Sequence, residues 1–409
     1  LLGVSVFLAV MTLPFLVPMG RLLPLGYALI GKNSKNYGRV CGEVYFTNTL
    51  GTVAGAVFLS HLLLHFLDID QIFRLNIILI AALTCLLLAR EGRKGRALLA
   101  LAAVGAVFLL PAWDRSAHHL GLFRMHRRAD IPARGIFQVP KLYRGEVVFF
   151  GDGPNSTVSV LERSNPDGRT REATFVVNGK SDGDTEIDYS TMSLVAVLAY
   201  LYGPEREDLS GIVVGLGTGV TAGILGLAEE VEKVVVLEIS PLAIAAQPFF
   251  DDYNRGLSGN GKVTIDETDA FRHFARERER ADLVVAEPST AWVVGVENLF
   301  TPEFYSLVNR NMTDDGVFLQ WIHIGENTDE IFLSILDNMT GAFSHLKLYQ
   351  ISAGDVAVIA SRRPLPLKER RFSEEAVRGV REQIRIRDRG LLPLLEVCDG
   401  HRLRWLAAG

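Results

Sequence analysis

The stretch Gly211-Ile212-Val213-Val214-Gly215-Leu216-Gly217-Thr218-Gly219 decides the fold, because an apolar strand-like run meets a glycine-rich turn there. Glycine lets a backbone turn sharply and approach a ligand closely, and the helix that follows offers its first amides to an anion. We therefore expect Gly215, Gly217 and Gly219 to line a nucleotide-type cofactor site. Two alternatives stay open. The spacing Gly217-x-Gly219-x-x-Ala222 fits a dinucleotide fingerprint and an NAD-dependent enzyme, and a plain tight turn needs no ligand.

A second stretch carries the candidate reacting group. The apolar run 282–285 stops at a carboxylate in Ala286-Glu287-Pro288-Ser289-Thr290-Ala291-Trp292. Ligands bind at the carboxyl ends of the strands of an open α/β sheet, so Glu287 is placed to position or deprotonate an attacking amine. A structural acid that holds Ser289 or Trp292 is the alternative.

Two further acids stand at predicted strand ends. Glu238 comes about 20 residues after the glycines, where a carboxylate can accept hydrogen bonds from both hydroxyls of a ribose. Asp269 follows the third predicted strand and can accept from the amine of adenine, with Ala270 leaving room for the ring. Asp269 can also cap a helix, and Glu238 can be an ordinary surface acid.

Strand-like and helix-like segments alternate from residue 211 onward, which predicts a doubly wound, mostly parallel, seven-stranded Rossmann-like sheet of the S-adenosylmethionine methyltransferase type. The last two strands form an antiparallel hairpin, because only Ser352-Ala353-Gly354-Asp355 separates them. The predicted strands are 211–215, 233–238, 262–265, 282–287, 316–321, 345–349 and 355–360.

The segments before and after this sheet predict smaller parts. Residues 114–155 read as a linker, and residues 156–205 as a small β module plus helix, with turns at 165–168 and 178–183 and strands at 156–161 and 174–177. Its helix is expected over 192–202. The main domain is expected over 206–365, and a charged, helical tail over 366–409.

Residues 1–113 are strongly apolar and predict about four transmembrane helices, so the lipid bilayer is an expected partner. Buried core helices are the alternative. The apolar runs are 1–30, 44–67, 72–88 and 97–113. Because the chain begins inside such a run and without Met, we expect further membrane segments upstream.

The membrane topology is read from the basic loops. Loops 31–40 and 90–96 are basic and favour the cytoplasmic side, but basic residues after position 113 nearly cancel this bias. A nucleotide-type cofactor argues for a cytoplasmic catalytic domain. We therefore expect an integral protein of the bacterial inner membrane.

Charge and cysteine content exclude other classes. The net charge of −5 over 409 residues gives no sign of a nucleic-acid partner. Cys41, Cys85 and Cys398 lie far apart, so they form neither a metal-ligand pattern nor a disulfide framework.

Taken together, these motifs resemble spermidine synthases, and more closely the membrane-fused spermidine-synthase-like proteins of bacteria, over most of residues 35–361. Besides the glycine loop, the matching motifs are Tyr37-Gly38-Arg39, Asn48-Thr49-Leu50-Gly51, Asn178-Gly179-Lys180, Glu238, Asp269-Ala270, Glu287-Pro288-Ser289 with Trp292, Asn298-Leu299-Phe300-Thr301 and Gln320-Trp321.

This resemblance implies an enzyme of polyamine biosynthesis. The family transfers an aminopropyl group from decarboxylated S-adenosylmethionine to a small amine acceptor, without a metal. By the resemblance Glu238 holds ribose, Asp269 holds adenine and Glu287 stands at the position of the catalytic aspartate. The same resemblance places Ser289, Trp292 and Gln320 on the acceptor side. A homodimer stays open.

The chain departs from the family on the acceptor side. Soluble spermidine synthases have Asp-Ser-Ser-Asp where this chain has Glu287-Pro288-Ser289-Thr290, so the second acid is missing. Val197-Leu198-Ala199 replaces a His-Leu-Pro, and Met192 replaces a glutamine. Two other functions therefore stay open: a methyltransferase that uses S-adenosylmethionine, and a membrane protein that binds the nucleoside without catalysis.

Overall fold

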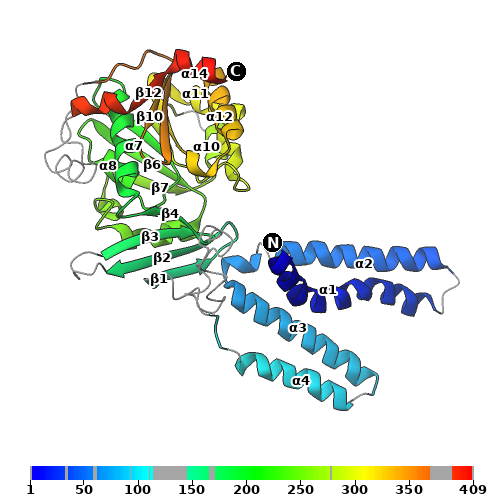
Figure 1. Ribbon diagram of the computed structural model, residues 1–409. Coiled ribbons are helices and arrows are strands. Elements are labelled where there is room, and N and C mark those ends of the chain that lie inside the picture. Colours follow the sequence, from blue (N-terminus) through cyan, green and yellow to red (C-terminus); the bar gives the residue numbers. More distant parts are fainter. Residues whose placement is uncertain are drawn as a thin grey trace. The chain divides into compact units, whose positions relative to one another are not determined.

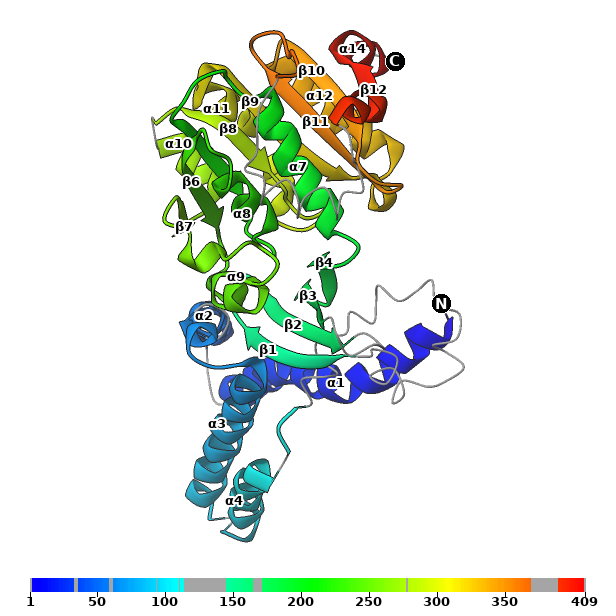
Figure 2. The same ribbon diagram turned by 90° about the vertical axis from the view of Figure 1, so that its left-hand side faces the viewer.

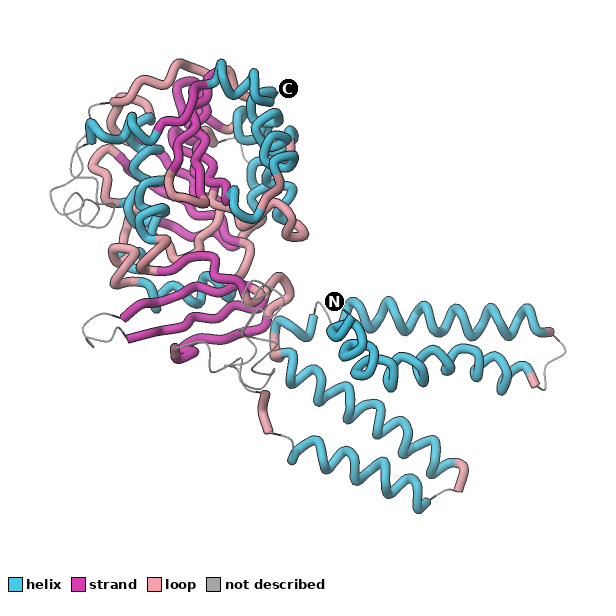
Figure 3. Tube along the Cα trace, in the orientation of Figure 1, coloured by secondary structure: helices cyan, strands magenta, loops and turns pink. Residues whose placement is uncertain are grey.

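The computed structural model describes residues 2–32, 36–58, 62–92, 94–109, 111–113, 145–164, 171–276, 279–368 and 389–407. It divides into two compact units, Leu1–Leu110 and Pro111–Gly409 (Figure 1). The first is helical, and the second contains both sheets (Figure 3). Most of the predicted linker, the turn at 165–168 and tail residues 369–388 lie outside the described residues. The finer division into domains stays a prediction.

The N-terminal unit consists of apolar helices that cover the four predicted runs. The main helices are α1 (Leu2–Gly31), α2 (Tyr37–Val57), α3 (Ile69–Arg90) and α4 (Lys94–Leu109), with the short η2 (Leu63–His65) before α3. Many of their apolar side chains are exposed, among them Leu22, Ile80 and Leu99. Within the described residues, α3 is the one helix long and apolar enough to cross a bilayer, which by itself indicates a membrane span only weakly.

The C-terminal unit begins with a small antiparallel sheet. Its strands, in spatial order, are β1 (Glu146–Asp152), β2 (Thr157–Ser164), β3 (Arg171–Val177) and β4 (Lys180–Asp184). The two-residue turn Asn178-Gly179 joins β3 to β4. The two residues have φ of 49° and 76°, and positive φ at both positions of such a turn matches the twist of the paired strands. Two strands differ from the prediction: β1 lies inside the expected linker, and β4 inside the expected turn at 178–183.

The main sheet is mixed. Its eight described strands run in the order β12-β10-β11-β9-β8-β5-β6-β7. Strands β7, β6, β5, β8 and β9 are parallel neighbours, whereas β11 pairs antiparallel with both β9 and β10. The strands are β5 (Leu209–Val214), β6 (Val231–Glu238), β7 (Val263–Glu267), β8 (Ala281–Ala286), β9 (Met312–His323), β10 (His345–Gln350), β11 (Asp355–Ser361) and β12 (Glu396–Asp399).

Helices cover both faces of this sheet, as Figure 2 shows. Alternate residues of one strand enter different cores: Val213 packs with α7 (Tyr189–Tyr202) and α8 (Val220–Gly226), while Ile212 packs on the opposite face. The opposite face is covered by α10 (Ala270–Arg276), α11 (Pro302–Arg310), α12 (Asp329–Ala342) and α14 (Gly400–Ala407).

The C-terminal tail contributes to the sheet, which the sequence did not predict. After η9 (Arg389–Leu395), strand β12 pairs antiparallel with β10, and Cys398 enters the second core. The expectation of a wholly helical tail is therefore wrong in this part. The strand makes the sheet eight-stranded rather than seven-stranded.

The small sheet packs beside the carboxyl ends of the parallel strands. Its inner residues Val158 and Phe175 form a third core with α9 (Pro241–Ala246) and η5 (Gln247–Phe250), which directly follow β6. Because α9 begins three residues after Glu238, this packing brings the small sheet to the edge where the predicted site residues lie.

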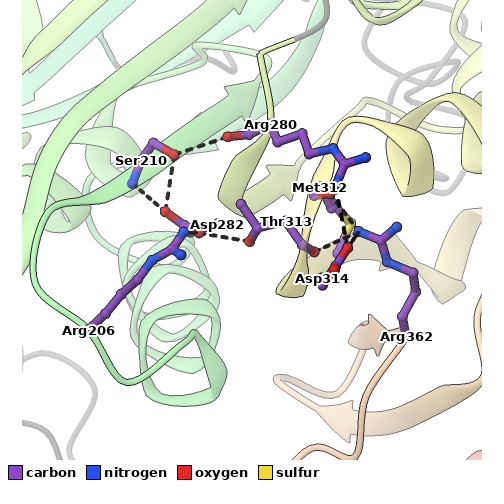
Figure 4. Close-up of polar contacts among 8 residues, drawn as sticks. All are labelled: Arg206, Ser210, Arg280, Asp282, Met312, Thr313, Asp314 and Arg362. Atoms are coloured by element: carbon purple, nitrogen blue, oxygen red, sulfur yellow. Dashed lines mark hydrogen bonds and ion pairs between the residues drawn. The ribbon is translucent and has the colours of Figure 1, made fainter.

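A polar network fixes the opposite, amino edge (Figure 4). Buried Asp282 at the start of β8 accepts hydrogen bonds from the Ser210 backbone at 2.9 Å and from Thr313 Oγ1 at 2.7 Å, and it pairs with Arg206. These contacts tie the first residues of β5, β8 and β9 together, so they set the register of the parallel strands.

Candidate functional site

The glycine loop forms the floor of the candidate site. Gly215, Gly217 and Gly219 have φ of 90°, 50° and 78°, values that L side chains rarely adopt. A Cβ on Gly219 would lie 2.4 Å from Gln247 Oε1, whereas a Cβ on Gly217 would meet nothing within 4 Å. The loop is therefore packed at Gly219 and open at Gly217, which is the side where a ligand can approach.

Two amide side chains hold this loop from behind. Gln247 Nε2 donates to the Gly217 carbonyl at 2.9 Å, and Asn254 Nδ2 donates to the Thr218 carbonyl at 3.2 Å. Both side chains are buried. They fix the left-handed conformation of the loop, and neither residue was predicted from the sequence.

Glu238 lies at the end of β6 and contacts the glycine loop. Its Oε2 accepts from the Leu216 backbone N–H at 2.9 Å, and its Oε1 accepts from the Ser240 N–H at 2.8 Å. Burial raises the pKa of this carboxyl, and the backbone hydrogen bonds oppose the rise. Since each carboxylate oxygen has a second lone pair, Glu238 can still accept hydrogen bonds from two ligand hydroxyls.

Asp269 stands beside the next strand end. Glu238 pairs in register with Glu267, the last residue of β7, so Asp269 follows two residues beyond that pair. Its Oδ1 accepts from the Arg272 N–H at 2.7 Å, which makes it the cap of α10. Ala270 is buried in the core under this helix start. The capping role is thus observed, and the contact with a base stays a prediction.

Glu287 directly follows β8 and touches the glycine loop through its backbone. Its N–H donates to the Val214 carbonyl at 3.1 Å, and a Cβ on Gly215 would lie 3.3 Å from the Glu287 carbonyl oxygen. Burial raises the pKa of its carboxyl to about 7, while a hydrogen bond with the Thr221 hydroxyl lowers it. A carboxyl with such a pKa can take up a proton near neutral pH.

The loop after Glu287 contacts the small sheet through Lys180. This lysine belongs to the motif Asn178-Gly179-Lys180, from which no role was predicted for it. Lys180 Nζ lies 3.2 Å from Asp182 Oδ1, 3.3 Å from Ser289 Oγ and 3.5 Å from Glu326 Oε2. Ser289 in turn donates to Asp182 at 3.2 Å. A Cβ on Gly183 of the same strand would lie 3.3 Å from Thr218 Cγ2, so this strand borders the glycine-loop side of the site.

A histidine–aspartate pair at the same edge was also missed. His323 ends β9, and its Nδ1 lies 2.7 Å from Oδ1 of Asp355 at the start of β11. The hydrogen bond with Asp355 raises the pKa of the His323 imidazole. Burial and the nearby charge of Asp184 raise the pKa of Asp188 to about 6. These groups carry additional charge toward the region of Lys180 and Glu326.

The other predicted acceptor residues differ in exposure. Trp292 is 46% exposed on the loop after β8. Gln320 is fully buried: its Oε1 accepts from Tyr305 Oη at 2.6 Å, and its Nε2 donates to the Leu299 carbonyl at 3.1 Å. Gln320 therefore holds the loop before α11 in this structure, and a direct contact with an acceptor stays a prediction.

Two surface hollows in the described part lie elsewhere. One of about 310 Å³ is lined by Tyr202, Pro204 and Leu365, and one of about 780 Å³ by Phe271, Pro302 and neighbouring residues of α10 to α12. Neither contains the glycine loop or the strand-end acids. We place the candidate site at the carboxyl edge because the loop, Glu238 and Glu287 are in contact there.

No metal-binding cluster is found in the part of the chain that the structure describes, where no three His, Cys, Asp or Glu side chains could together hold an ion. The arrangement offers instead a backbone cradle after β5, carboxylates at the ends of β6, β7 and β8 on the same edge, and a charged cluster on the small sheet. Such a site can bind a nucleoside and orient a second, amine-bearing ligand.

Comparisons with known proteins agree with the resemblance in the motifs. No family model matches the chain. A polyamine aminopropyltransferase from Bacillus cereus is 25% identical over 189 residues, which cover 44% of this chain and 68% of that protein. A polyamine aminopropyltransferase from Streptococcus pneumoniae is 26% identical over 149 residues, covering 36% of this chain and 50% of its own length.

Solved structures show the same fold. A spermidine synthase in complex with the transition-state analogue AdoDATO matches with a TM-score of 0.53 at 18% identity, over 64% of this chain and 89% of its own. The spermidine synthase from Thermotoga maritima matches with a TM-score of 0.50 at 18% identity, over 64% and 87%. The comparisons thus confirm the spermidine-synthase-type fold of the C-terminal unit and support a transferase.

Proposed function

We propose that the chain is an aminopropyltransferase that uses decarboxylated S-adenosylmethionine and a small amine. The observation that carries the proposal is the contact of Glu238 with the glycine loop at Leu216, next to Glu287 at the end of β8. The similarity to polyamine aminopropyltransferases and the shared fold support it. The acceptor itself and a homodimer stay predictions.

In this proposal the nucleoside lies along the carboxyl ends of β5, β6 and β7. Glu238 accepts from the ribose hydroxyls with its remaining lone pairs, and the open side of Gly217 admits the sugar. Asp269 keeps Oδ1 on the Arg272 N–H and turns Oδ2 to the exocyclic amine of adenine. Gly215 and Gly219 maintain the curvature of the loop.

Glu287 supplies the proton chemistry. The acceptor nitrogen forms a bond to the aminopropyl carbon next to the sulfonium, the carbon–sulfur bond breaks, and its electron pair stays on the sulfur of methylthioadenosine. Glu287 orients the acceptor and takes up the proton that the reacting ammonium group must lose before its nitrogen lone pair can attack, for which a pKa of about 7 is well matched. Alignment of nitrogen, carbon and sulfur gives most of the acceleration, and Ser289, Trp292 and Gln320 shape the acceptor side.

We further propose that the N-terminal unit anchors the enzyme in a bilayer, with the catalytic unit in the cytoplasm. Helix α3 is long and apolar enough to span, and apolar side chains of α2, α3 and α4 are exposed. Extraction of membranes by carbonate, followed by detection of the full chain, tests this part. Recovery in the supernatant would count against anchoring.

The enzymatic proposal is tested by incubating the purified full chain with decarboxylated S-adenosylmethionine and a panel of amines, and by measuring methylthioadenosine. We expect release that depends on the amine, and a loss of about 100-fold or more in kcat for Glu287→Gln. The matched control is Glu297→Gln, which removes a carboxylate ten residues further along the same connection.

Parallel arms with S-adenosylmethionine separate the alternatives. Formation of S-adenosylhomocysteine together with tighter binding of the carboxylated form would favour a methyltransferase. Tight nucleoside binding without any product in either arm would favour the non-catalytic membrane protein.

A further inference from the structure

Lys180 is the least expected charge in the candidate site. It is the first residue of β4, its side chain is only 14% exposed, and its ammonium group has three neighbouring acceptors, Asp182, Ser289 and Glu326. An ammonium group has three N–H donors. One hydrogen bond to Ser289 and two ion pairs therefore engage this ammonium group, and the bond to Ser289 connects the small sheet to the loop that follows Glu287.

The position of this ammonium group matters for the acceptor. Ser289 lies two residues after Glu287, and a Cβ on Gly183 of the same strand β4 would lie 3.3 Å from Thr218 Cγ2 in the glycine loop. Strand β4 thus lies against the glycine loop, and Lys180 contacts the loop proposed to meet the acceptor. An acceptor that carries an ammonium at each end would have to place one of them near this cation.

The charges around Lys180 do not provide for a second cation. Asp182 and Glu326 both lie within 3.5 Å of the Lys180 ammonium group, so each of these acids already faces a cation. Thr290, on the same loop, is buried and uncharged, and Asp355 is engaged by His323 at 2.7 Å. A ligand ammonium that approaches Ser289 would therefore meet the positive charge of Lys180 at close range.

We propose that Lys180 occupies the place of a second acceptor ammonium, so that the site takes amines with one positive charge in preference to diamines. The inference rests on the proposed function, since it concerns the acceptor side of the same site. Like charges held a few ångströms apart in a half-buried site repel by enough to change affinity about tenfold. Lys180 is then a residue that determines specificity and takes no part in the proton transfer.

Two matched ligands test the inference. Butylamine and 1,4-diaminobutane have the same carbon chain and differ by one ammonium group. Binding of each to the full chain is measured by calorimetry in the presence of methylthioadenosine, so that no turnover is needed. We expect wild type to bind butylamine about tenfold more tightly, and Lys180→Gln to reverse this order.

Two further variants make the test specific. Lys347→Gln removes another half-buried lysine, which pairs with Glu396 at 2.8 Å on the outer strands, and it is expected to keep the wild-type ratio. Thr290→Asp adds an acid of nearly the same size to the loop, and it is expected to improve binding of the diamine. If Lys180→Gln does not fold, as judged by its thermal transition, Lys180→Met, which keeps the length of the side chain and removes its charge, decides the question.

The outcomes separate this inference from the proposed function. If wild type binds the diamine as tightly as butylamine or binds neither amine, or if a folded Lys180→Gln leaves the ratio unchanged, the inference is overturned. If the ratio reverses while wild type releases no methylthioadenosine with any amine, the inference holds and the aminopropyltransferase assignment fails. Release with diamines alone would leave that assignment standing and refute the role of Lys180.

Discussion

The carboxylate of Glu238 accepts a hydrogen bond from the backbone N–H of Leu216, with 2.9 Å between Oε2 and the nitrogen. This bond joins the end of β6 to the middle of the glycine loop that follows β5. The two strands are parallel neighbours, so the loop and the carboxylate face the same edge. A ligand that binds the backbone of the loop therefore lies within reach of the Glu238 carboxylate.

Replacing Glu238 by Gln should weaken nucleoside binding without unfolding the protein. The Gln side chain has one accepting oxygen where Glu has two, so either a backbone N–H group or a ligand hydroxyl loses its acceptor. We expect the affinity for the nucleoside to fall about 10- to 100-fold because of this unmatched donor. Calorimetry with methylthioadenosine measures this. Glu232→Gln is the control, because Glu232 is an exposed acid at the other end of the same strand. Equal affinity of Glu238→Gln and wild type would contradict the ribose role.

Gly219→Ala should mainly lower the stability of the protein, whereas Gly217→Ala should mainly weaken nucleoside binding. A Cβ on Gly219 would lie 2.4 Å from Gln247 Oε1 at a φ of 78°, so we expect a loss of about 3 kcal/mol in the free energy of unfolding. A Cβ on Gly217 meets no neighbour within 4 Å, and its φ of 50° costs about 1 kcal/mol. Its methyl group should instead obstruct the ligand. Denaturant unfolding and nucleoside titration of both variants measure the two effects, and unchanged nucleoside affinity of Gly217→Ala would argue that the open side is not the ligand side.

Glu287 should make the stability of the protein depend on pH. Burial raises its pKa from 4.5 to about 7, so the folded protein binds the proton more tightly than the unfolded chain between these values. Its contribution to stability is therefore present at low pH and is lost as pH rises through the folded pKa. Relative to Glu287→Gln, wild type should lose about 2 kcal/mol in the free energy of unfolding between about pH 5 and about pH 8. Parallel pH profiles of the two proteins would refute the raised pKa.

The strand-end acids could be predicted from the sequence because a short run of residues with β preference is enough to predict a strand and its last residue. The run Val234-Val235-Val236-Leu237 has strong β preference and delivers Glu238 to the edge without help from distant residues. Glu287 follows from the same reasoning on β8. The polar strands were missed: Lys180–Asp184 is a strand because the Asn178-Gly179 turn pairs it with β3, and Glu396–Asp399 is one because β10 offers an open edge.

Contacts across long sequence separations could not be predicted in this way. Lys180 and Ser289 are 109 positions apart and meet only because the small sheet packs on α9 and η5. The same holds for His323 and Asp355, which approach because β11 runs antiparallel to β9. Asp282 was expected simply as the first residue of a strand, and its four polar contacts come from three different segments.

Asp282→Ala should destabilise the C-terminal unit without removing any predicted site residue. The side chain is 2% exposed and accepts hydrogen bonds from Ser210, Thr313 and Arg206 at the amino edge, opposite the candidate site (Figure 4). Loss of this buried acceptor leaves the half-buried donors of Ser210 and Thr313 without this partner and removes the ion pair with Arg206, and we expect a decrease of about 3 kcal/mol in the free energy of unfolding. Asp314→Ala is the matched control, because Asp314 is 70% exposed and pairs with Arg280 and Arg362 at 3.4 and 3.6 Å; we expect about 0.5 kcal/mol there. Nucleoside affinity of the folded Asp282→Ala protein should equal that of wild type, since Asp282 lies at the amino edge and makes its hydrogen bonds with Arg206, Ser210 and Thr313, none of which belongs to the candidate site. A large decrease in affinity at a temperature where the variant is fully folded would show that the amino-edge network also sets the geometry of the glycine loop.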